Sequence, residues 1–103
     1  MLGICNGFQA LVKYALLPGT GQQKITLAFN DSGRFEDRWV YLKPEGNSVW
    51  TRGISSLYLP VRHGEGKLTA PASEIESIEA EGLVALRYAA PNGEEPSYPH
   101  NPN

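Results

Sequence analysis

The single cysteine of this 103-residue chain lies between two glycines, in the stretch Gly3-Ile4-Cys5-Asn6-Gly7. A Gly-x-Cys-x-Gly sequence at a strand-to-helix junction is the cysteine counterpart of the nucleophile elbow, a tight turn that lifts the nucleophile out of a sheet. The positive end of the following helix would favour the reactive thiolate, and the backbone N–H of Asn6 would donate to an oxyanion. The pattern predicts acyl chemistry at Cys5. A buried cysteine in a glycine-flanked turn is an equal alternative on these five residues.

The two histidines offer further chemistry. His63 lies in the glycine-containing stretch RHGEG, and placed beside Cys5 it would form a Cys-His dyad, whereas a plain turn histidine is an equal alternative. A metal site built from Cys5, His63 and His100 is the weakest interpretation, because no close-spaced pair of ligands anchors it. The sequence therefore predicts no metal site.

A helix and several strands must position these residues. Apolar side chains recur at helical spacing from Phe8 to Leu16, which predicts a helix that runs to about Leu17 and is ended by Pro18 and Gly19. Four β-rich runs bounded by turn residues follow, at 24–29, 35–42, 57–62 and 83–89.

Two features refine this pattern. Pro60 cannot donate a ladder hydrogen bond, which predicts that the run 57–62 is an edge strand or ends there. The stretch 73–82 predicts a short acidic helix, with Ser73 and Glu76 at capping-box spacing and Gly82 at the stop. This order of elements predicts an α/β or α+β domain.

Composition excludes several classes of protein. A chain of 103 residues, 41% of them hydrophobic, builds one ordinary core. The net charge of −2, with Lys and Arg spread along the chain, argues against nucleic-acid and membrane-surface partners. One cysteine excludes an internal disulfide framework, and no apolar run is long enough to span a membrane. A reducing, cytoplasmic setting is therefore expected.

The full heptapeptide GICNGFQ, from Gly3 to Gln9, resembles the nucleophile motif of class I (triad-type) glutamine amidotransferases. Four further stretches occur in that family's order: LLPG, NDSGRFEDRWVYL, PVRHGEG and YPHNPN. Together they are most similar to the glutaminase subunits or domains of phosphoribosylformylglycinamidine synthases. The resemblance implies hydrolysis of glutamine and transfer of ammonia to a synthetase subunit or domain, which uses ATP and Mg in purine biosynthesis. It implies no cofactor in this chain itself.

The resemblance also implies roles for individual residues. Cys5 would attack the side-chain amide of glutamine and form a glutamyl thioester. Asn6 takes the position of the oxyanion donor, and Gln9 the position that helps to hold the substrate. His63 and Gly64 fall in the turn whose backbone would bind the amino and carboxylate ends of glutamine.

Three charged residues, Arg34, Glu36 and Arg38, lie in a family-like segment near the site or the partner interface, without individual chemistry. Arg38 and Trp39 would form a cation–π or core-edge pair.

The fold implied by the resemblance is α/β: a flavodoxin-like, open and mostly parallel sheet with helices on both faces, from the nucleophile elbow onward. We expect residues 1–103 to be a partial glutamine amidotransferase domain. The strands ahead of the elbow and a later stretch that carries the catalytic His and Glu are missing, so the chain alone should be nearly inactive. Two alternatives remain open: a non-catalytic binding or interaction module derived from that domain, and another α/β cysteine hydrolase.

Overall fold

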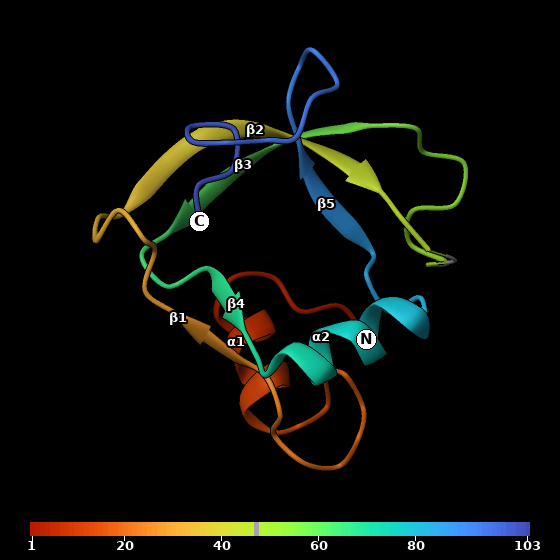
Figure 1. Cartoon of the computed structure of the whole chain (residues 1–103). Helices are drawn as coiled ribbons and strands as arrows, with labels where there is room; N and C mark the ends of the chain where they lie inside the picture. The colour runs from red at the N-terminus through yellow and green to blue at the C-terminus, as the bar shows by residue number, and fades with distance from the viewer. Residues whose placement is uncertain (47) are drawn as a thin grey trace.

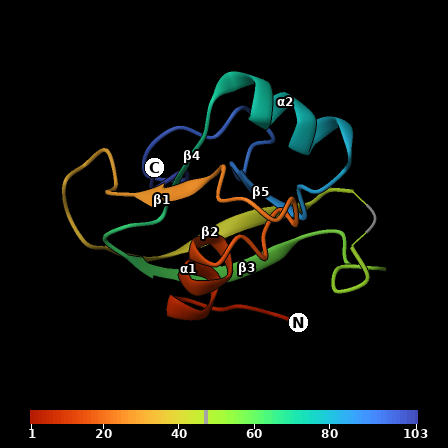
Figure 2. The same cartoon turned by 90° about the horizontal axis from the view of Figure 1, so that it is seen from below.

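The computed structural model describes residues 1–46 and 48–103, which form two helices and two small sheets (Figure 1). The helices are α1 (Asn6–Lys13) and α2 (Ala72–Ala80), and the strands are β1 (Thr26–Ala28), β2 (Glu36–Pro44), β3 (Leu57–His63), β4 (Lys67–Thr69) and β5 (Leu86–Ala89). Strands β2 and β3 run along the top of Figure 1, and β5 extends from them down toward α2; both helices and the two-stranded sheet lie in the lower half. Figure 2, turned by 90°, shows the two helices apart from one another at opposite edges of this lower half.

The three-stranded sheet has the order β3-β2-β5, with both pairings antiparallel. Pro60 lies opposite Trp39 on β3, which is an edge strand as predicted. An edge position suits proline because its missing N–H then costs no hydrogen bond between strands. Trp39 and Tyr41 both stack with Tyr58 of β3, with ring centroids 5.3 and 4.6 Å apart.

The two-stranded sheet pairs β1 with β4, with Leu27 opposite Leu68. Helix α1 packs against β1, so this small sheet connects the helix that follows Cys5 with the RHGEG stretch that precedes β4. Strand β4 was not among the predicted strands, because its three residues are too few to show a strand period.

Helix α1 ends at Lys13, four residues before the predicted end. Ala15 adopts a left-handed conformation with φ 56°. The N–H of Leu16 donates to the carbonyl of Leu11 over 2.9 Å, which closes a Schellman motif after the helix. The apolar spacing continued through this turn, so it predicted a longer helix than the backbone forms.

Helix α2 begins at Ala72, directly after Pro71, and no side chain of the described residues caps it. The predicted capping box at Ser73 and Glu76 is therefore wrong, because the helix starts before Ser73 and the fixed φ of proline suits that start. The predicted stop at Gly82 is confirmed: its φ is 67°, and the N–H of Leu83 bonds to the carbonyl of Ile78. Within the part of the chain that the structure describes, no helix is long and apolar enough to cross a membrane.

The α/β class is confirmed, but the strand pairing differs from the mostly parallel sheet that the resemblance implies. All pairings between the described strands are antiparallel. Parallel neighbours need a crossover connection, usually through a helix. Here α2 connects β4 to β5, which belong to different sheets, so it creates no parallel pair.

Candidate functional site

Cys5 occupies a strained backbone position immediately before α1. Its φ of 56° and ψ of −122° lie outside the regions that L-residues favour. Its carbonyl accepts the N–H groups of Phe8 and Gln9, at 3.0 and 3.2 Å, so the helix holds it in place. The residue is exposed, which contradicts the buried-cysteine alternative. A strained, accessible thiol at a helix N-terminus agrees with the elbow pattern. The strand of the predicted strand-to-helix junction is not formed by residues 1–4, which precede α1 without regular structure.

The two glycines that flank Cys5 are not equivalent. A Cβ on Gly3 would lie 2.8 Å from the backbone carbonyl of Gly7 and 2.6 Å from Leu11 Cδ1, so the turn requires glycine there. A Cβ on Gly7 would meet no atom of the described residues within 4 Å. The close approach that defines the elbow therefore depends on Gly3.

A pocket of about 320 Å³ lies along α1, and we call it the α1 pocket. Two of the predicted site residues, Asn6 and Gln9, line it together with Glu65 from the RHGEG stretch. The side-chain Nε2 of Gln9 donates to the Glu65 carbonyl over 3.4 Å. The fold thus joins two of the stretches on which the resemblance rests. The remaining lining residues are Ala10, Val12, Lys13, Gln23, Thr26 and Leu27.

The RHGEG turn is organised by Asn30, which is only 3% exposed. Its side-chain Nδ2 donates to the carbonyls of His63 and Arg34, at 2.7 and 2.9 Å. Its Oδ1 accepts the N–H of Gly66 at 3.2 Å, and its own N–H donates to the Gly64 carbonyl at 2.9 Å. Sequence reasoning missed Asn30. The turn composition of NDSG was the available signal, because asparagine commonly bonds to nearby backbone in such turns.

His63 faces Asn30. Its Nδ1 lies 2.9 Å from Asn30 Oδ1, and its Nε2 is buried without a hydrogen-bond partner among the described residues. Burial lowers the pKa of His63, so the neutral ring is favoured. Within residues 1–46 and 48–103 no hydrogen bond joins this ring to Cys5, so the structure does not support the Cys-His dyad.

His100 lies in the turn of residues 98–100. Among the described residues, no three His, Cys, Asp or Glu side chains are grouped closely enough to hold a metal ion. The alternative metal site of Cys5, His63 and His100 therefore has no geometric support.

The FEDR segment contacts the YPHNPN segment near the chain's end. Glu36 is buried and pairs with the Arg38 guanidinium, which stacks 4.9 Å over the Tyr98 ring. Arg38 also donates to the Tyr98 hydroxyl at 3.1 Å, and Arg34 lies 3.5 Å from the same oxygen. A hydrogen bond from Ser32, together with the charge of Arg38, holds the pKa of Glu36 below its usual value. The predicted Arg38–Trp39 pair is wrong, since β-strand alternation sends these neighbours to opposite faces.

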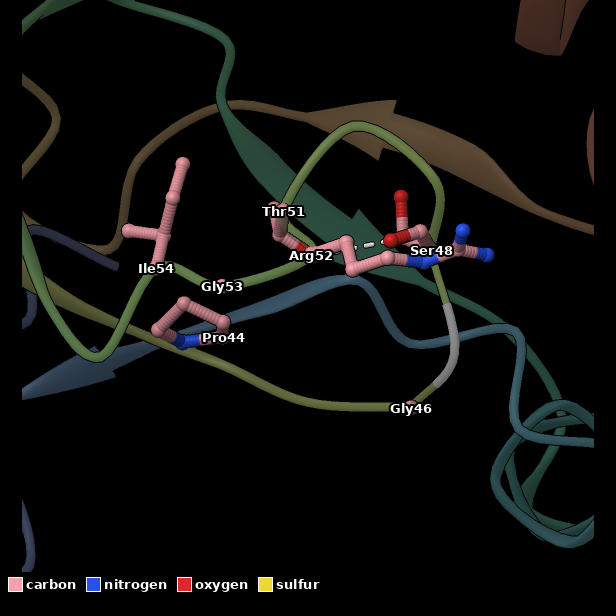
Figure 3. Close-up of a pocket in the computed structure, with 7 residues that line it drawn as sticks. All are labelled: Pro44, Gly46, Ser48, Thr51, Arg52, Gly53 and Ile54. Atoms are coloured by element: carbon pink, nitrogen blue, oxygen red, sulfur yellow. Dashed lines mark hydrogen bonds between the residues drawn. The ribbon is translucent and has the colours of Figure 1, made fainter.

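A second pocket, of about 300 Å³, lies in the loop between β2 and β3 (Figure 3). Thr51 Oγ1 donates to the Ser48 carbonyl there over 3.5 Å. The lining contains none of the predicted site residues, so this pocket is separate from the candidate site. The residues drawn in Figure 3 are Pro44, Gly46, Ser48, Thr51, Arg52, Gly53 and Ile54.

Curated relatives match nearly all of this chain. One from Dehalococcoides mccartyi is 50% identical over 107 residues, which cover 99% of this chain and 40% of the relative. Others from Treponema denticola and Archaeoglobus fulgidus are 34% and 36% identical; each match covers the whole chain and 46% or 43% of the relative. All three are named phosphoribosylformylglycinamidine synthase subunit PurQ. This chain thus spans less than half the length of these relatives.

A protein-family comparison covers the whole sequence. The model of the CobB/CobQ-like glutamine amidotransferase domain matches residues 1–103. The matched range includes Cys5, Asn6, Gln9 and the RHGEG turn, on which the resemblance rests, and also the α1 pocket that the structure adds. The chain therefore belongs to the family of CobB/CobQ-like glutamine amidotransferase domains.

Proposed function

We propose that this chain is the nucleophile-bearing part of a glutaminase that serves a phosphoribosylformylglycinamidine synthase. It would hydrolyse the side-chain amide of glutamine and supply ammonia for purine biosynthesis. The observation that carries this proposal is the exposed, strained Cys5 at the start of α1, next to a pocket in which Gln9 is bonded to the RHGEG turn. The names of its relatives, each a PurQ subunit of that synthase, support the same reading.

The reaction begins when the Cys5 thiolate attacks the side-chain carbonyl carbon of glutamine. The new C–S bond places negative charge on the carbonyl oxygen, and the backbone N–H of Asn6 donates to it. As the first residue of α1, Asn6 has an N–H with no carbonyl partner inside the helix. The C–N bond then breaks as the nitrogen takes a proton from water, which replaces the one that the Cys5 thiol lost on ionising, and ammonia leaves. Water hydrolyses the glutamyl thioester to glutamate and the free Cys5 thiol.

The rest of the substrate is assigned to the α1 pocket and to the neighbouring turn at Gly64, which does not itself line that pocket. The Gln9 side chain lies one helical turn beyond Cys5, and we assign it to contact the part of the substrate that faces α1. The carbonyls of His63 and Gly64 already accept bonds from Asn30. We therefore assign the backbone N–H of the turn at Gly64 to the substrate carboxylate, because N–H groups are the donors that a carboxylate accepts.

The proposed partner is the synthetase subunit or domain, which would hold ATP and Mg and receive the ammonia. A cytoplasmic location is part of the proposal, because a nucleophilic thiol remains reduced there. A net charge of −2 gives no support to nucleic-acid or anionic-membrane partners.

A non-catalytic glutamine-binding module is the second candidate. The observation that favours it is the hydrogen bond between the His63 ring and Asn30. The ring is thus turned to Asn30, and no imidazole within the described residues is hydrogen-bonded to Cys5 as a general base would be. Such a module would bind glutamine at the α1 pocket without releasing ammonia.

The test measures covalent labelling of Cys5 in the whole protein that carries this sequence. Each reagent's labelling rate for Cys5 is divided by its rate with the thiol of glutathione. By this ratio a chloroketone analogue of glutamine should prefer Cys5 much more strongly than iodoacetamide does. Free glutamine should protect Cys5 from the analogue. Gln9→Ala should slow the analogue while leaving iodoacetamide labelling unchanged. Cys5→Ser is the control for the labelled position.

Ammonia release separates the candidates. Protection by glutamine together with turnover supports the glutaminase, and protection without turnover supports the binding module. If the analogue shows no preference over iodoacetamide and glutamine gives no protection, Cys5 is not part of a glutamine site and the proposal is wrong.

A further inference from the structure

We propose that Asn30 is the positioning residue of the 63–66 turn, His63 to Gly66, and that it holds His63 as the neutral tautomer with its proton on Nδ1. The turn then presents its backbone to the ligand, while the imidazole stays inside. The substrate in this inference is the glutamine of the proposed function, on which the kinetic part rests. The tautomer is a property of the protein alone.

The hydrogen bonds of the Asn30 side chain determine which of its atoms is oxygen. Two carbonyl oxygens, from His63 and Arg34, lie 2.7 and 2.9 Å from one end of the amide, which must therefore be the NH₂ group. The N–H of Gly66 points to the other end at 3.2 Å, which must be the oxygen. Reversing the amide would bring donor to donor and acceptor to acceptor at three contacts.

This orientation determines the tautomer of His63. Its Nδ1 lies 2.9 Å from Asn30 Oδ1, and an amide oxygen can only accept. The proton must therefore be on Nδ1, and in the neutral ring Nε2 carries the lone pair. Sequence spacing could not indicate this contact, because β2 and most of β3 lie between Asn30 and His63 along the chain.

The packing of Gly66 keeps the His63 ring inside the turn. A Cβ added to Gly66 would lie 2.3 Å from His63 Nδ1 and 2.4 Å from Cε1, so the ring rests against the glycine backbone. His63 Nε2 is buried as well. The imidazole therefore fills the turn, and the group that the turn directs toward α1 is the Glu65 carbonyl, which accepts the bond from Gln9.

Asn30 thus acts on the α1 pocket through other residues. It holds the backbone of His63, Gly64 and Gly66, and this turn positions Glu65 at the pocket wall. A second asparagine braces the same turn from the chain's end, where Asn103 Nδ2 donates to the Gly66 carbonyl over 3.0 Å. Loss of the Asn30 bonds should therefore alter substrate affinity more than the chemistry at Cys5.

The tautomer is tested by nitrogen NMR on the whole protein labelled with ¹⁵N-histidine. The His63 signals are assigned as those that His63→Gln removes, and His100→Gln, which removes the other histidine of this sequence, is the matched control. At neutral pH we expect the His63 ring to show a protonated Nδ1 and an unprotonated Nε2. A ring protonated on Nε2 would overturn the inference, whatever the protein's activity.

The positioning role is tested by Asn30→Asp, which keeps the shape but replaces the donor NH₂ by an acceptor. We expect KM for glutamine to rise roughly tenfold or more, the scale of one buried hydrogen bond, with kcat changed much less. Asn92→Asp makes the same chemical change at an exposed position and should change neither. A fall in kcat with unchanged KM would indicate a merely structural role and contradict the proposal. If the wild-type protein hydrolyses no glutamine, the proposed function fails while the NMR result still decides the tautomer.

Discussion

Cys5 and His63 are the two side chains from which the sequence suggested a Cys-His dyad, and the fold places them in opposite environments. Cys5 is exposed on a strained backbone, held by helix N–H groups that bond to its carbonyl. His63 is drawn inside its turn, with a hydrogen bond to a buried asparagine and a ring packed on Gly66. The elbow thus exposes the Cys5 thiol, whereas the side chains of Asn30 and His63 hold the backbone shape of the turn.

This difference indicates where substitutions should act. Strained backbone of the Cys5 kind costs about 1–3 kcal/mol and persists only when neighbouring contacts hold it. In the elbow those contacts are the close approach at Gly3 and the first turn of α1. In the 63–66 turn the shape rests on Asn30 and on the missing Cβ of Gly66. Each region can therefore be disturbed without touching the other.

The largest effect is expected from Cys5→Ser. If Cys5 is the nucleophile, ammonia release from glutamine by the whole protein should fall by roughly four orders of magnitude or more. Because Cys5 is exposed, the substitution should leave the fold intact, and circular dichroism with a thermal melt checks this. If Cys5→Ser retained most of the wild-type rate of ammonia release, Cys5 would not be the nucleophile, and it would not differ from His63 in function.

The two glycines around Cys5 provide the next test. Gly3→Ala should destabilise the protein by about 2–4 kcal/mol and slow Cys5 labelling, because the new Cβ meets the Gly7 carbonyl and cannot be accommodated without moving the elbow. Gly7→Ala should be neutral or stabilise the fold by up to about 1 kcal/mol, since alanine favours the helix and meets open space.

Both free energies of unfolding can be measured by urea titration. Equal effects of the two substitutions would show that the elbow does not depend on the close contact at Gly3.

A corresponding pair exists in the turn. Gly66→Ala should cost about 1–3 kcal/mol, because its Cβ would lie on the His63 ring. Gly64→Ala should change the free energy of unfolding by less than about 0.5 kcal/mol, since its nearest new contact is Phe35 Cδ2 at 3.9 Å. The measurement is again urea unfolding, with Cys5 alkylation by iodoacetamide as the readout of the elbow. Slower alkylation in Gly66→Ala would mean that the two regions are coupled.

The smallest effect concerns pH. Burial lowers the pKa of His63 in the folded protein, so the unfolded chain binds this proton more readily. The contribution of His63 to stability is therefore fully present above its unfolded pKa of about 6.5 and is lost as the pH falls below it. Urea unfolding between about pH 7.5 and pH 5.5 should show decreasing stability.

His63→Gln should flatten this pH dependence, and His100→Gln, which keeps His63, should retain it. The lowered pKa of Glu36 acts in the same direction but only at more acidic pH, below its ordinary value of 4.5. A pH dependence that survives His63→Gln would show that burial of this ring is not its cause.

Much of the local structure could be predicted from the sequence. The β-rich runs, the edge position of Pro60 and the stop at Gly82 depend on residue type and spacing, and each is present. The helix ends were less predictable. The left-handed turn at Ala15 and the start of α2 after Pro71 replaced a longer helix and a capping box. Hydrogen bonds across the ends decided these boundaries, and apolar spacing does not report them.

For the candidate site, the sequence by itself determined the tight turn at Cys5, because a glycine-flanked cysteine before a helix restricts the backbone within a few residues. It could not determine what His63 does. That depended on Asn30, which the fold brings to the end of β3, and on Gly66, whose missing Cβ makes room for the ring. Tertiary structure alone decided that Gln9 meets Glu65 and that Arg38 stacks on Tyr98 instead of Trp39. The physical reason is the separation along the chain over which each interaction acts. Backbone strain and turn geometry act between neighbours in sequence. A buried polar group instead forms hydrogen bonds with whichever segments the fold brings next to it.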